Sequence, residues 1–177
     1  MRVARVQALL HSDVRDADFS FDVEEEALPP FDGPTLTNVA PVARYRKRYS
    51  IESEQWTSTA TRVVIAAAGA SRGVAGYLIA SRSWNNCAQI DDFAVDRGQR
   101  RAGVGRMLMA EAIAWAREMG LAAVRAETQS NNVAACRFYE RLGFSLGGFD
   151  RYLYAGLDAP ARFETALFWY LSLERQP

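Results

Sequence analysis

The spacing of hydrophobic and polar residues is most regular in the middle of the chain. Apolar residues recur every three or four positions over Val104–Met119, which predicts an amphipathic helix. A second helix is predicted over Val133–Leu142, with Asn131 or Asn132 as its N-cap and a glycine after each helix as its stop. Runs rich in strand-forming residues predict strands over Arg62–Ala68, Val74–Ala80, Ala88–Val95, Ala122–Thr128, Phe144–Tyr154 and Thr165–Leu173.

The first third of the chain has a less regular pattern. Alternation over Phe19–Glu25 predicts a half-buried strand, and Leu28–Pro41, with four of the six prolines, is predicted to be a loop. Val42–Trp56 mixes aromatic and basic residues and is predicted to hold a helix. Its basic run Arg44–Tyr49 would be a solvated face of that helix, with a role at the acceptor site or as a lid as the alternative. No helix or strand is predicted in the first 17 residues. The order of the predicted strands and helices along the chain predicts a mixed α/β sheet.

Length and composition predict a single globular domain over residues 1–177, because 49% of the residues are hydrophobic and 24% are charged. Lys and Arg together number 21, as do Asp and Glu, so the charge balance argues against nucleic acid or a membrane surface as partner. The longest apolar run, Val63–Ala70, is too short to span a bilayer, and the first residues make a poor signal peptide.

Reactive side chains outside the central motifs are few. Cys87 and Cys136 form no disulfide framework, which favours a reduced, cytoplasmic protein. Cys136 lies within a predicted helix and is interpreted as a buried small residue rather than a nucleophile. His11 is the single histidine, so neither a catalytic triad nor a metal site is predicted.

A glycine-containing loop precedes the first central helix. Arg100, Gly103 and Gly105 form R-x-x-G-x-G between a strand-like run and the helix start, where amide groups and the positive helix end favour a pyrophosphate. The predicted phosphate contacts are Arg100, Arg101, Ala102, Gly103, Val104, Gly105 and Arg106. The motif is neither a P-loop, since Val104-Gly105 replaces Lys-Ser/Thr, nor a dinucleotide fingerprint, since Leu108 replaces the last glycine. An ordinary turn with a solvated basic face is the alternative.

A second motif, N-x-x-A-x-x-x-Y, contains Asn132, Ala135 and Tyr139 at the predicted second helix. The phenol of Tyr139 could serve as an acid, although a lone helical tyrosine usually packs in a core. Glu127 lies near the end of the preceding strand, so that strand end and the helix are predicted to flank one cleft. Asp91 and Asp92 point to opposite faces of their strand, and solvated edge charges are the alternative for both.

The two motifs, in this order, resemble the acetyl-CoA site of the GNAT superfamily of N-acetyltransferases over residues 62–154. The resemblance implies an α/β GNAT fold, a mixed, mostly antiparallel sheet with a splayed central strand pair and flanking helices. It implies acetyl-CoA as co-substrate, without a metal. Backbone groups of Phe93, Ala94 and Val95 would bind pantetheine and the acetyl carbonyl, with Asn132 and Ala135 also at the cofactor. Tyr139 would protonate the departing thiolate.

The resemblance also implies a catalytic base. Glu127 would deprotonate the acceptor amine, and Asp92 is the second candidate for the base or for recognition of a cationic substrate. The segments G-Y-L-I-A-S-R-S-W-N and E-T-Q-S-N-N-V-A-A-C-R-F-Y-E are similar to those of streptothricin acetyltransferases, which implies a small cationic amine as substrate. Asp91, Asp92, Glu127 and Asp150 could line its site. N-terminal protein acetylation and a non-catalytic CoA sensor are the alternatives, and either a monomer or a homodimer is expected.

Overall fold

The chain forms two compact units whose segments alternate along the sequence. The computed structural model describes residues 2–49, 51, 54–69 and 73–174. Unit 1 consists of the described residues within Met1–Phe21, Arg48–Val124 and Leu173–Pro177. Unit 2 consists of Asp22–Lys47 and Arg125–Ser172. Each unit therefore combines N-terminal residues with residues far along the chain.

Unit 1 is built on four antiparallel strands. Their order is β1 (Val3–Val6), β6 (Arg62–Ala68), β7 (Val74–Arg82) and β8 (Cys87–Val95). The predicted strands after residue 60 are confirmed here, because their apolar runs are buried on both faces. The turn between β6 and β7 includes positions outside the described residues.

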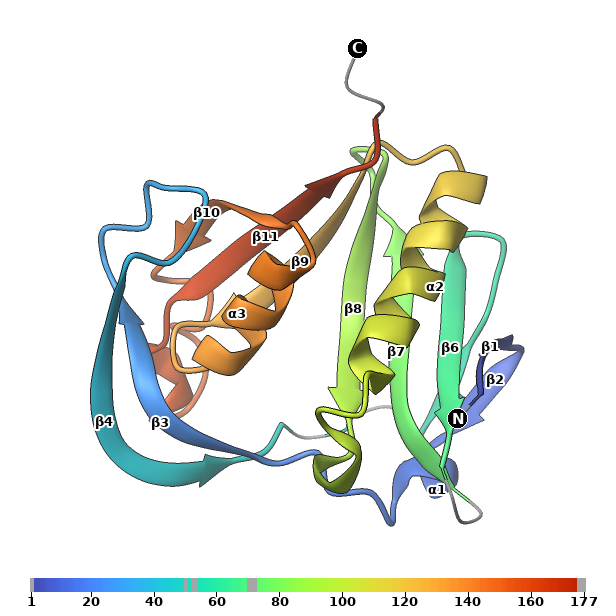
Figure 1. Ribbon diagram of the computed structural model, residues 1–177, viewed down its shortest axis with the longest axis horizontal. Coiled ribbons are helices and arrows are strands. Elements are labelled where there is room, and N and C mark those ends of the chain that lie inside the picture. Colours follow the sequence, from blue (N-terminus) through green and yellow to red (C-terminus); the bar gives the residue numbers. More distant parts are fainter. Residues whose placement is uncertain (1, 50, 52–53, 70–72, 175–177) are drawn as a thin grey trace. The chain divides into compact units, whose positions relative to one another are not determined.

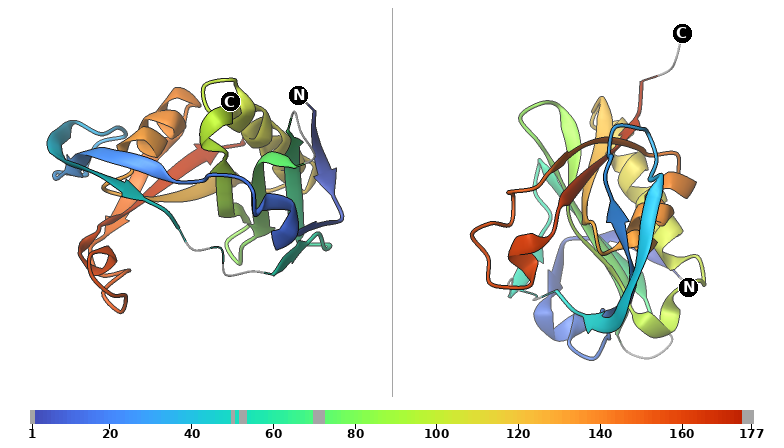
Figure 2. Two further views of the ribbon diagram at one scale, coloured as in Figure 1. Left: turned by 90° about the horizontal axis from the view of Figure 1, so that it is seen from below. Right: turned by 90° about the vertical axis from the view of Figure 1, so that its left-hand side faces the viewer.

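Each face of this sheet is covered by a different part of unit 1. The helix α2 (Val104–Glu118) lies across one face and buries Leu108, Met109 and Ala112 (Figure 1). The other face packs against β2 (Ala8–Leu10), α1 (His11–Val14) and β5 (Gln55–Thr57). Figure 2 shows these three elements from two further directions. Full burial of one Leu or Met side chain contributes about 1.5–3 kcal/mol, so α2 is held mainly by its apolar stripe.

Unit 2 combines a helix with two groups of strands. The strands β9 (Ala123–Gln129), β11 (Ala166–Ser172) and β10 (Ser145–Asp150) are neighbours in that order, and β10 pairs antiparallel with β11. The helix α3 (Val133–Arg141) packs against β9 and β11 through Cys136 and Tyr139 (Figure 1). A separate two-stranded sheet pairs β3 (Phe21–Leu28) with β4 (Asn38–Lys47). Two short 3-10 turns are η1 (Arg97–Gln99) and η2 (Ala161–Phe163).

The predicted α/β class with a mostly antiparallel sheet is confirmed, but the N-terminal third was partly mispredicted. The helix predicted over Val42–Trp56 is wrong, because strand β4 extends to Lys47 and β5 begins at Gln55. Arg44 and Arg46 are solvent-exposed, as predicted, but they lie on a strand rather than a helix, and both donate to Asp22 of the neighbouring strand β3. The loop predicted over Leu28–Pro41 is shorter, because β4 begins at Asn38.

Other boundaries differ less from the predictions. The first 17 residues, for which no element was predicted, contain β1, β2 and α1. The last predicted strands are shorter, with β10 ending at Asp150. Asn132 is the N-cap of α3, as predicted, and both Gly120 and Gly143 adopt positive φ angles after their helices.

No helix in the described part of the chain is long and apolar enough to cross a bilayer. The single domain and the splayed strand pair stay predictions.

Candidate active site

The glycine loop of unit 1 ends at the start of α2, where the sequence predicts a phosphate site. Gly103 is the N-cap of the helix and has a φ of 83°. L residues with side chains rarely adopt this region, so glycine suits the position. The first backbone bond of the helix runs from Met107 N to Gly103 O (3.1 Å). The amides of Val104, Gly105 and Arg106 therefore precede the helical hydrogen-bond ladder and are suited to an anion.

Hydrogen bonds fix the residues that lead into this loop. Asp96 accepts from Gly98 N (2.9 Å) and from Asp18 N (2.7 Å), and Arg97 N donates to Asp18 O (2.7 Å). Arg100 donates from Nε to Val95 O and from Nη2 to Phe19 O, both at 3.1 Å. The Arg100 guanidinium thus ties the loop to its strand and to the N-terminal segment. A phosphate contact by Arg100 stays a prediction.

The two other arginines predicted to contact phosphate are more open to solvent. Arg101 and Arg106 are exposed, as are Ala102 and Gly103. Arg101 also has a positive φ of 65°, a conformation that costs a non-glycine residue free energy. The exposed end of α2 therefore carries two cations beside the amides of its first turn.

A close approach of three elements positions the end of β8. A Cβ added to Gly76 on β7 would lie 2.8 Å from Ala94 O and 3.2 Å from the side chain of Leu108 on α2. Glycine lets the strand and the helix approach without this clash. Ala94 and Val95, whose backbone groups are predicted to bind pantetheine, are half-buried and lie opposite Tyr77 and Gly76.

An irregularity in β8 separates the two adjacent aspartates. Asp92 pairs with Ile79 whereas Ile90 pairs with Ala80, so Asp91 is the extra residue of a β-bulge. Asp91 accepts from Ser81 Oγ (2.9 Å), while Asp92 accepts from Tyr77 Oη (2.9 Å). The two carboxylates therefore have different partners, but Tyr77 and Ser81 lie four residues apart on β7 and so on the same face of that strand. The prediction that Asp91 and Asp92 face opposite sides is wrong, because the bulge interrupts the alternation of side chains.

Asp92 and Tyr77 lie in an apolar setting. The Tyr77 ring contacts Phe19 edge-on (5.4 Å between centroids) and Trp56 (5.1 Å). Burial raises the pKa of Asp92, although hydrogen bonds from Tyr77 and the Phe93 backbone oppose the increase. Burial and the Asp92 charge also raise the pKa of Tyr77, which stays a neutral donor. Asp92 is therefore a stronger base than an exposed aspartate. Tyr77, its donor, was not identified from the sequence.

Replacing Asp92 by asparagine should increase the free energy of unfolding at neutral pH by about 0.5–2 kcal/mol. Because the folded pKa of Asp92 is raised, the folded state binds its proton more tightly than the unfolded chain, whose value is about 3.9. The contribution of Asp92 to stability therefore decreases as pH rises through the folded pKa. Asparagine removes this loss and still accepts from Tyr77. Urea unfolding at several pH values measures the difference.

The control for this prediction is Asp16→Asn, because the Asp16 side chain is 90% exposed. We expect this control to change stability little at any pH. An Asp92→Asn variant whose stability relative to the unmodified protein does not increase with pH would contradict the expectation.

Tyr139 lies in unit 2, inside an aromatic cluster. Only 4% of its surface is exposed, and its ring stacks on Trp169 at 6.4 Å and contacts Phe144 at 5.2 Å. Cys136, one turn earlier on α3, is buried beside Thr128 (3.3 Å). Burial raises the pKa of the Cys136 thiol to about 11, so this cysteine stays protonated and is a poor nucleophile.

Glu127 lies on β9 and is half-buried. Tyr154 donates from its hydroxyl to Glu127 Oε1 (2.6 Å), and Gln129 donates from Nε2 to the same hydroxyl (3.0 Å). Tyr154 was not identified from the sequence, because 27 residues separate it from Glu127. Asp150 lies at the end of β10 and accepts from Tyr152 N (2.7 Å).

A buried polar network holds the turn before α3. Asn132 accepts from Ala135 N (3.2 Å), which caps the helix. Asn131 donates to Tyr45 Oη (2.8 Å) and to Glu164 Oε1 (2.9 Å) and accepts from Lys47 Nζ (3.1 Å). Lys47 also pairs with Glu164 Oε2 (2.6 Å). These groups fix the residues that precede the predicted cofactor contacts Asn132 and Ala135.

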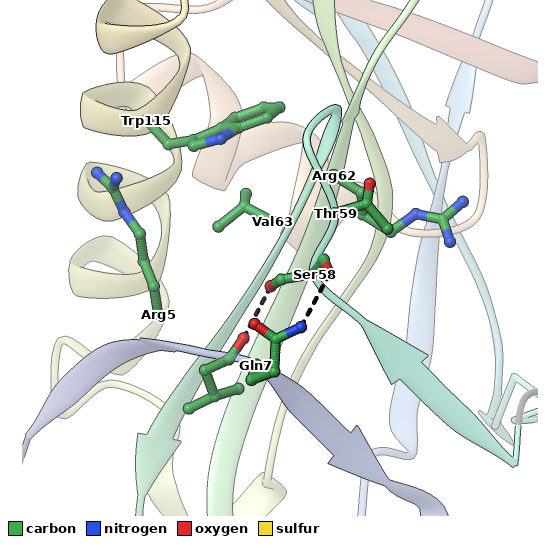
Figure 3. Close-up of a pocket in the computed structure, with 8 residues that line it drawn as sticks. Arg5, Gln7, Ser58, Thr59, Arg62, Val63 and Trp115 are labelled. Atoms are coloured by element: carbon green, nitrogen blue, oxygen red, sulfur yellow. Dashed lines mark hydrogen bonds between the residues drawn. The ribbon is translucent and has the colours of Figure 1, made fainter.

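A hollow of about 280 Å³ lies elsewhere in unit 1 and contains none of the predicted site residues (Figure 3). Arg5 and Trp115 form part of its wall, with Ser58 and Gln7 bonded to each other across the strands. Arg5 pairs with Glu111 and Glu118, so its charge is balanced within the protein. We assign no function to this hollow.

The predicted residues thus form two groups. Unit 1 brings together Asp92, the backbone of Phe93–Val95 and the glycine loop before α2. Unit 2 contains Glu127, the N-cap of α3 and Tyr139, but Thr128 is the β9 residue that contacts α3, so the adjacent Glu127 points to the other face of the strand. The first group has the amides and cations that suit a bound anion. The second has a carboxylate and a phenol, which are suited to proton transfer.

The chain belongs to the acetyltransferase (GNAT) family, whose profile matches residues 23–144. Streptothricin acetyltransferase of Escherichia coli is 33% identical over 73% of this chain and 71% of its own. Streptothricin acetyltransferase A of Bacillus subtilis is 41% identical over 50% of each chain, so that alignment spans half of the relative's length.

A solved structure supports the fold over almost the whole chain. A Bacillus anthracis protein assigned as a streptothricin acetyltransferase, in complex with acetyl coenzyme A, superposes with a TM-score of 0.80. It is 33% identical, and the match covers 98% of this chain and 100% of that chain. The predicted GNAT fold and the predicted similarity to streptothricin acetyltransferases are both confirmed.

Proposed function

We propose that this protein transfers the acetyl group of acetyl-CoA directly to a primary amine of a small cationic, streptothricin-like molecule. The observation that supports the acetyl-CoA assignment is the start of α2, where Gly103 and the amides after it are suited to an anion beside two exposed arginines. The similarity to streptothricin acetyltransferases supports the acceptor class. A cytoplasmic location, predicted from the sequence, is part of the same proposal.

The proposed reaction begins with proton removal from the acceptor. An alkyl ammonium has a reference pKa of about 10.4, so the nitrogen must lose a proton before it attacks. Glu127 is the proposed base, because it is a half-buried carboxylate held in place by Tyr154. Asp92 is the second candidate, since burial raises its pKa and thus its basicity.

Groups of this chain would then stabilise the charges that develop on the carbonyl oxygen and on the leaving sulfur. Acetyl-CoA supplies a thioester-activated acetyl group and a thiolate leaving group. The backbone amides of Ala94 or Val95 are suited to stabilise the negative charge that develops on the carbonyl oxygen, whereas the predicted contact Phe93 already donates from its backbone to Asp92. Tyr139 would donate its proton to the leaving sulfur. The protonated thiol of Cys136 supports direct transfer rather than a covalent acetyl-enzyme.

An acceptor panel tests the proposal. We expect kcat/KM for streptothricin to exceed that for an alanine-initiated peptide or spermidine by at least about tenfold, which corresponds to 1.4 kcal/mol in the transition state. Thiol release from acetyl-CoA measures each rate, and the reaction without amine is the control. Preference for the peptide would indicate N-terminal protein acetylation. Acetyl-CoA binding without turnover of any amine would indicate a sensor.

A further inference from the structure

A tyrosine outside both motifs contacts the proposed base. Tyr154 lies between β10 and η2, in a segment in which residues 151–160 are otherwise exposed, and is itself half-buried. Its neighbour Tyr152 is 80% exposed. The Tyr154 hydroxyl bridges Glu127 and Gln129, which lie two residues apart on β9 and therefore on the same side of the strand. This contact joins the segment to the carboxylate.

The direction of each hydrogen bond follows from the chemistry of the groups. The side-chain NH₂ of Gln129 can only donate, and an ionised carboxylate can only accept. The Tyr154 oxygen therefore accepts from Gln129 and directs its own proton to Glu127 Oε1. The 2.6 Å distance between the phenol and carboxylate oxygens is in the range of charge-assisted O–H···O⁻ bonds, which are stronger than neutral ones.

The bond leaves one side of the carboxylate available. Within the described part of the chain, Glu127 Oε1 is the oxygen that Tyr154 engages, and no hydrogen bond reaches Oε2. A carboxylate held by one oxygen keeps a fixed rotamer, and its other oxygen can accept a proton from an amine. Because effective proton transfer needs a heavy-atom separation of about 2.6–3.2 Å, such fixation favours a productive geometry.

From this geometry we infer that Tyr154 is a positioning residue, which holds Glu127 by Oε1 and presents Oε2 to the acceptor amine, with Gln129 orienting the Tyr154 hydroxyl. The inference rests on the proposed function, since it assumes that Glu127 is the base. Tyr154 itself exchanges no proton with the substrate in this arrangement. Its effect should therefore depend on the presence of the Glu127 carboxylate.

Kinetics of Tyr154→Phe test this inference, with the amine that turns over fastest in the acceptor panel. The variant keeps the ring and loses the donor, so we expect kcat to fall about tenfold while KM for acetyl-CoA is unchanged. Tyr152→Phe is the matched control, because it removes a hydroxyl from the same segment at an exposed position. We expect this control to retain the full rate.

A double-variant cycle shows whether Tyr154 acts through Glu127. We expect Glu127→Gln to lower kcat, and Tyr154→Phe to cause no further decrease in that background, because coupled residues are non-additive. Gln129→Leu should lower kcat in the same direction and to a smaller extent. It provides a second test if Tyr154→Phe is poorly folded.

The outcomes separate this inference from the proposed function. If Glu127→Gln retains the full kcat, the assignment of Glu127 as base is wrong, and the inference is wrong with it. If Glu127→Gln loses rate while Tyr154→Phe and Gln129→Leu stay within about twofold of the unmodified protein, only the inference is overturned. Equal losses from Tyr154→Phe with and without the Glu127 carboxylate would also overturn it.

Discussion

Replacing Tyr139 by phenylalanine should lower kcat by about 10²–10⁴-fold, the usual contribution of general acid catalysis. A thiol of this kind has a pKa near the cysteine reference of about 8.5, so the departing thiolate gains from a proton donor at neutral pH. The ring that stacks on Trp169 and contacts Phe144 is retained in the variant. We therefore expect the free energy of unfolding to change by no more than about 1 kcal/mol.

Steady-state kinetics and calorimetric binding of acetyl-CoA together distinguish the possible roles of Tyr139. Tyr170→Phe on β11 is the control, because it removes the hydroxyl of another tyrosine of unit 2. A rate within about threefold of the unmodified protein would make Tyr139 a packing residue. Loss of acetyl-CoA binding would instead make the hydroxyl a cofactor anchor. Only a lower rate with unchanged acetyl-CoA binding supports the role of Tyr139 as general acid.

Replacing Gly103 by valine should weaken acetyl-CoA binding by at least about tenfold, or 1.4 kcal/mol. Its φ of 83° is unfavourable for a β-branched residue, and relief of that strain would turn the amides that begin α2. No other group lies within 4 Å of an added Cβ, so the substitution does not overpack the fold. Calorimetric titration with acetyl-CoA measures the effect.

The opposite end of the same helix provides a matched control. Gly120 also has a positive φ, 66°, and an added Cβ there likewise meets no group within 4 Å. Gly120→Val therefore introduces a comparable backbone strain, far along α2 from the predicted phosphate contacts. If both variants bind acetyl-CoA equally well when folded, the phosphate-loop prediction is wrong.

Local patterns predicted the elements whose structure depends on local signals. The three- and four-residue spacing of Val104–Met119 predicted α2, and Asn132 signalled the start of α3. The basic run after Val42 was mispredicted because its strand is stabilised from outside the run. Arg44 and Arg46 find their partner in Asp22, across the β3–β4 pair. Such cross-strand pairing is not visible in the local sequence.

For the candidate site, too, the sequence predicted the local motifs but not the contacts between distant residues. The glycine loop and the N-x-x-A-x-x-x-Y motif could be identified because their residues lie close together along the chain. Tyr77, Tyr154 and Lys47 were missed, because each contacts its partner only after folding. The bond from Lys47 to Glu164 joins residues 117 positions apart, and no spacing rule indicates such a pair.

The position of β11 in unit 2 has a consequence for the synthesis of this protein. β11 lies between β9 and β10 and buries Trp169 completely, although it follows every other strand of the described residues. Glu164, just before β11, pairs with Lys47, which lies 117 residues earlier in the chain. A ribosome that adds about 5–20 residues per second therefore reaches Glu164 roughly 6–23 s after Lys47. Until β11 is synthesised, the nascent β9 and β10 lack the strand that lies between them and are exposed to chaperones and proteases. A chain that stopped before Ala166 would lack that strand, and unit 2 could not complete its sheet.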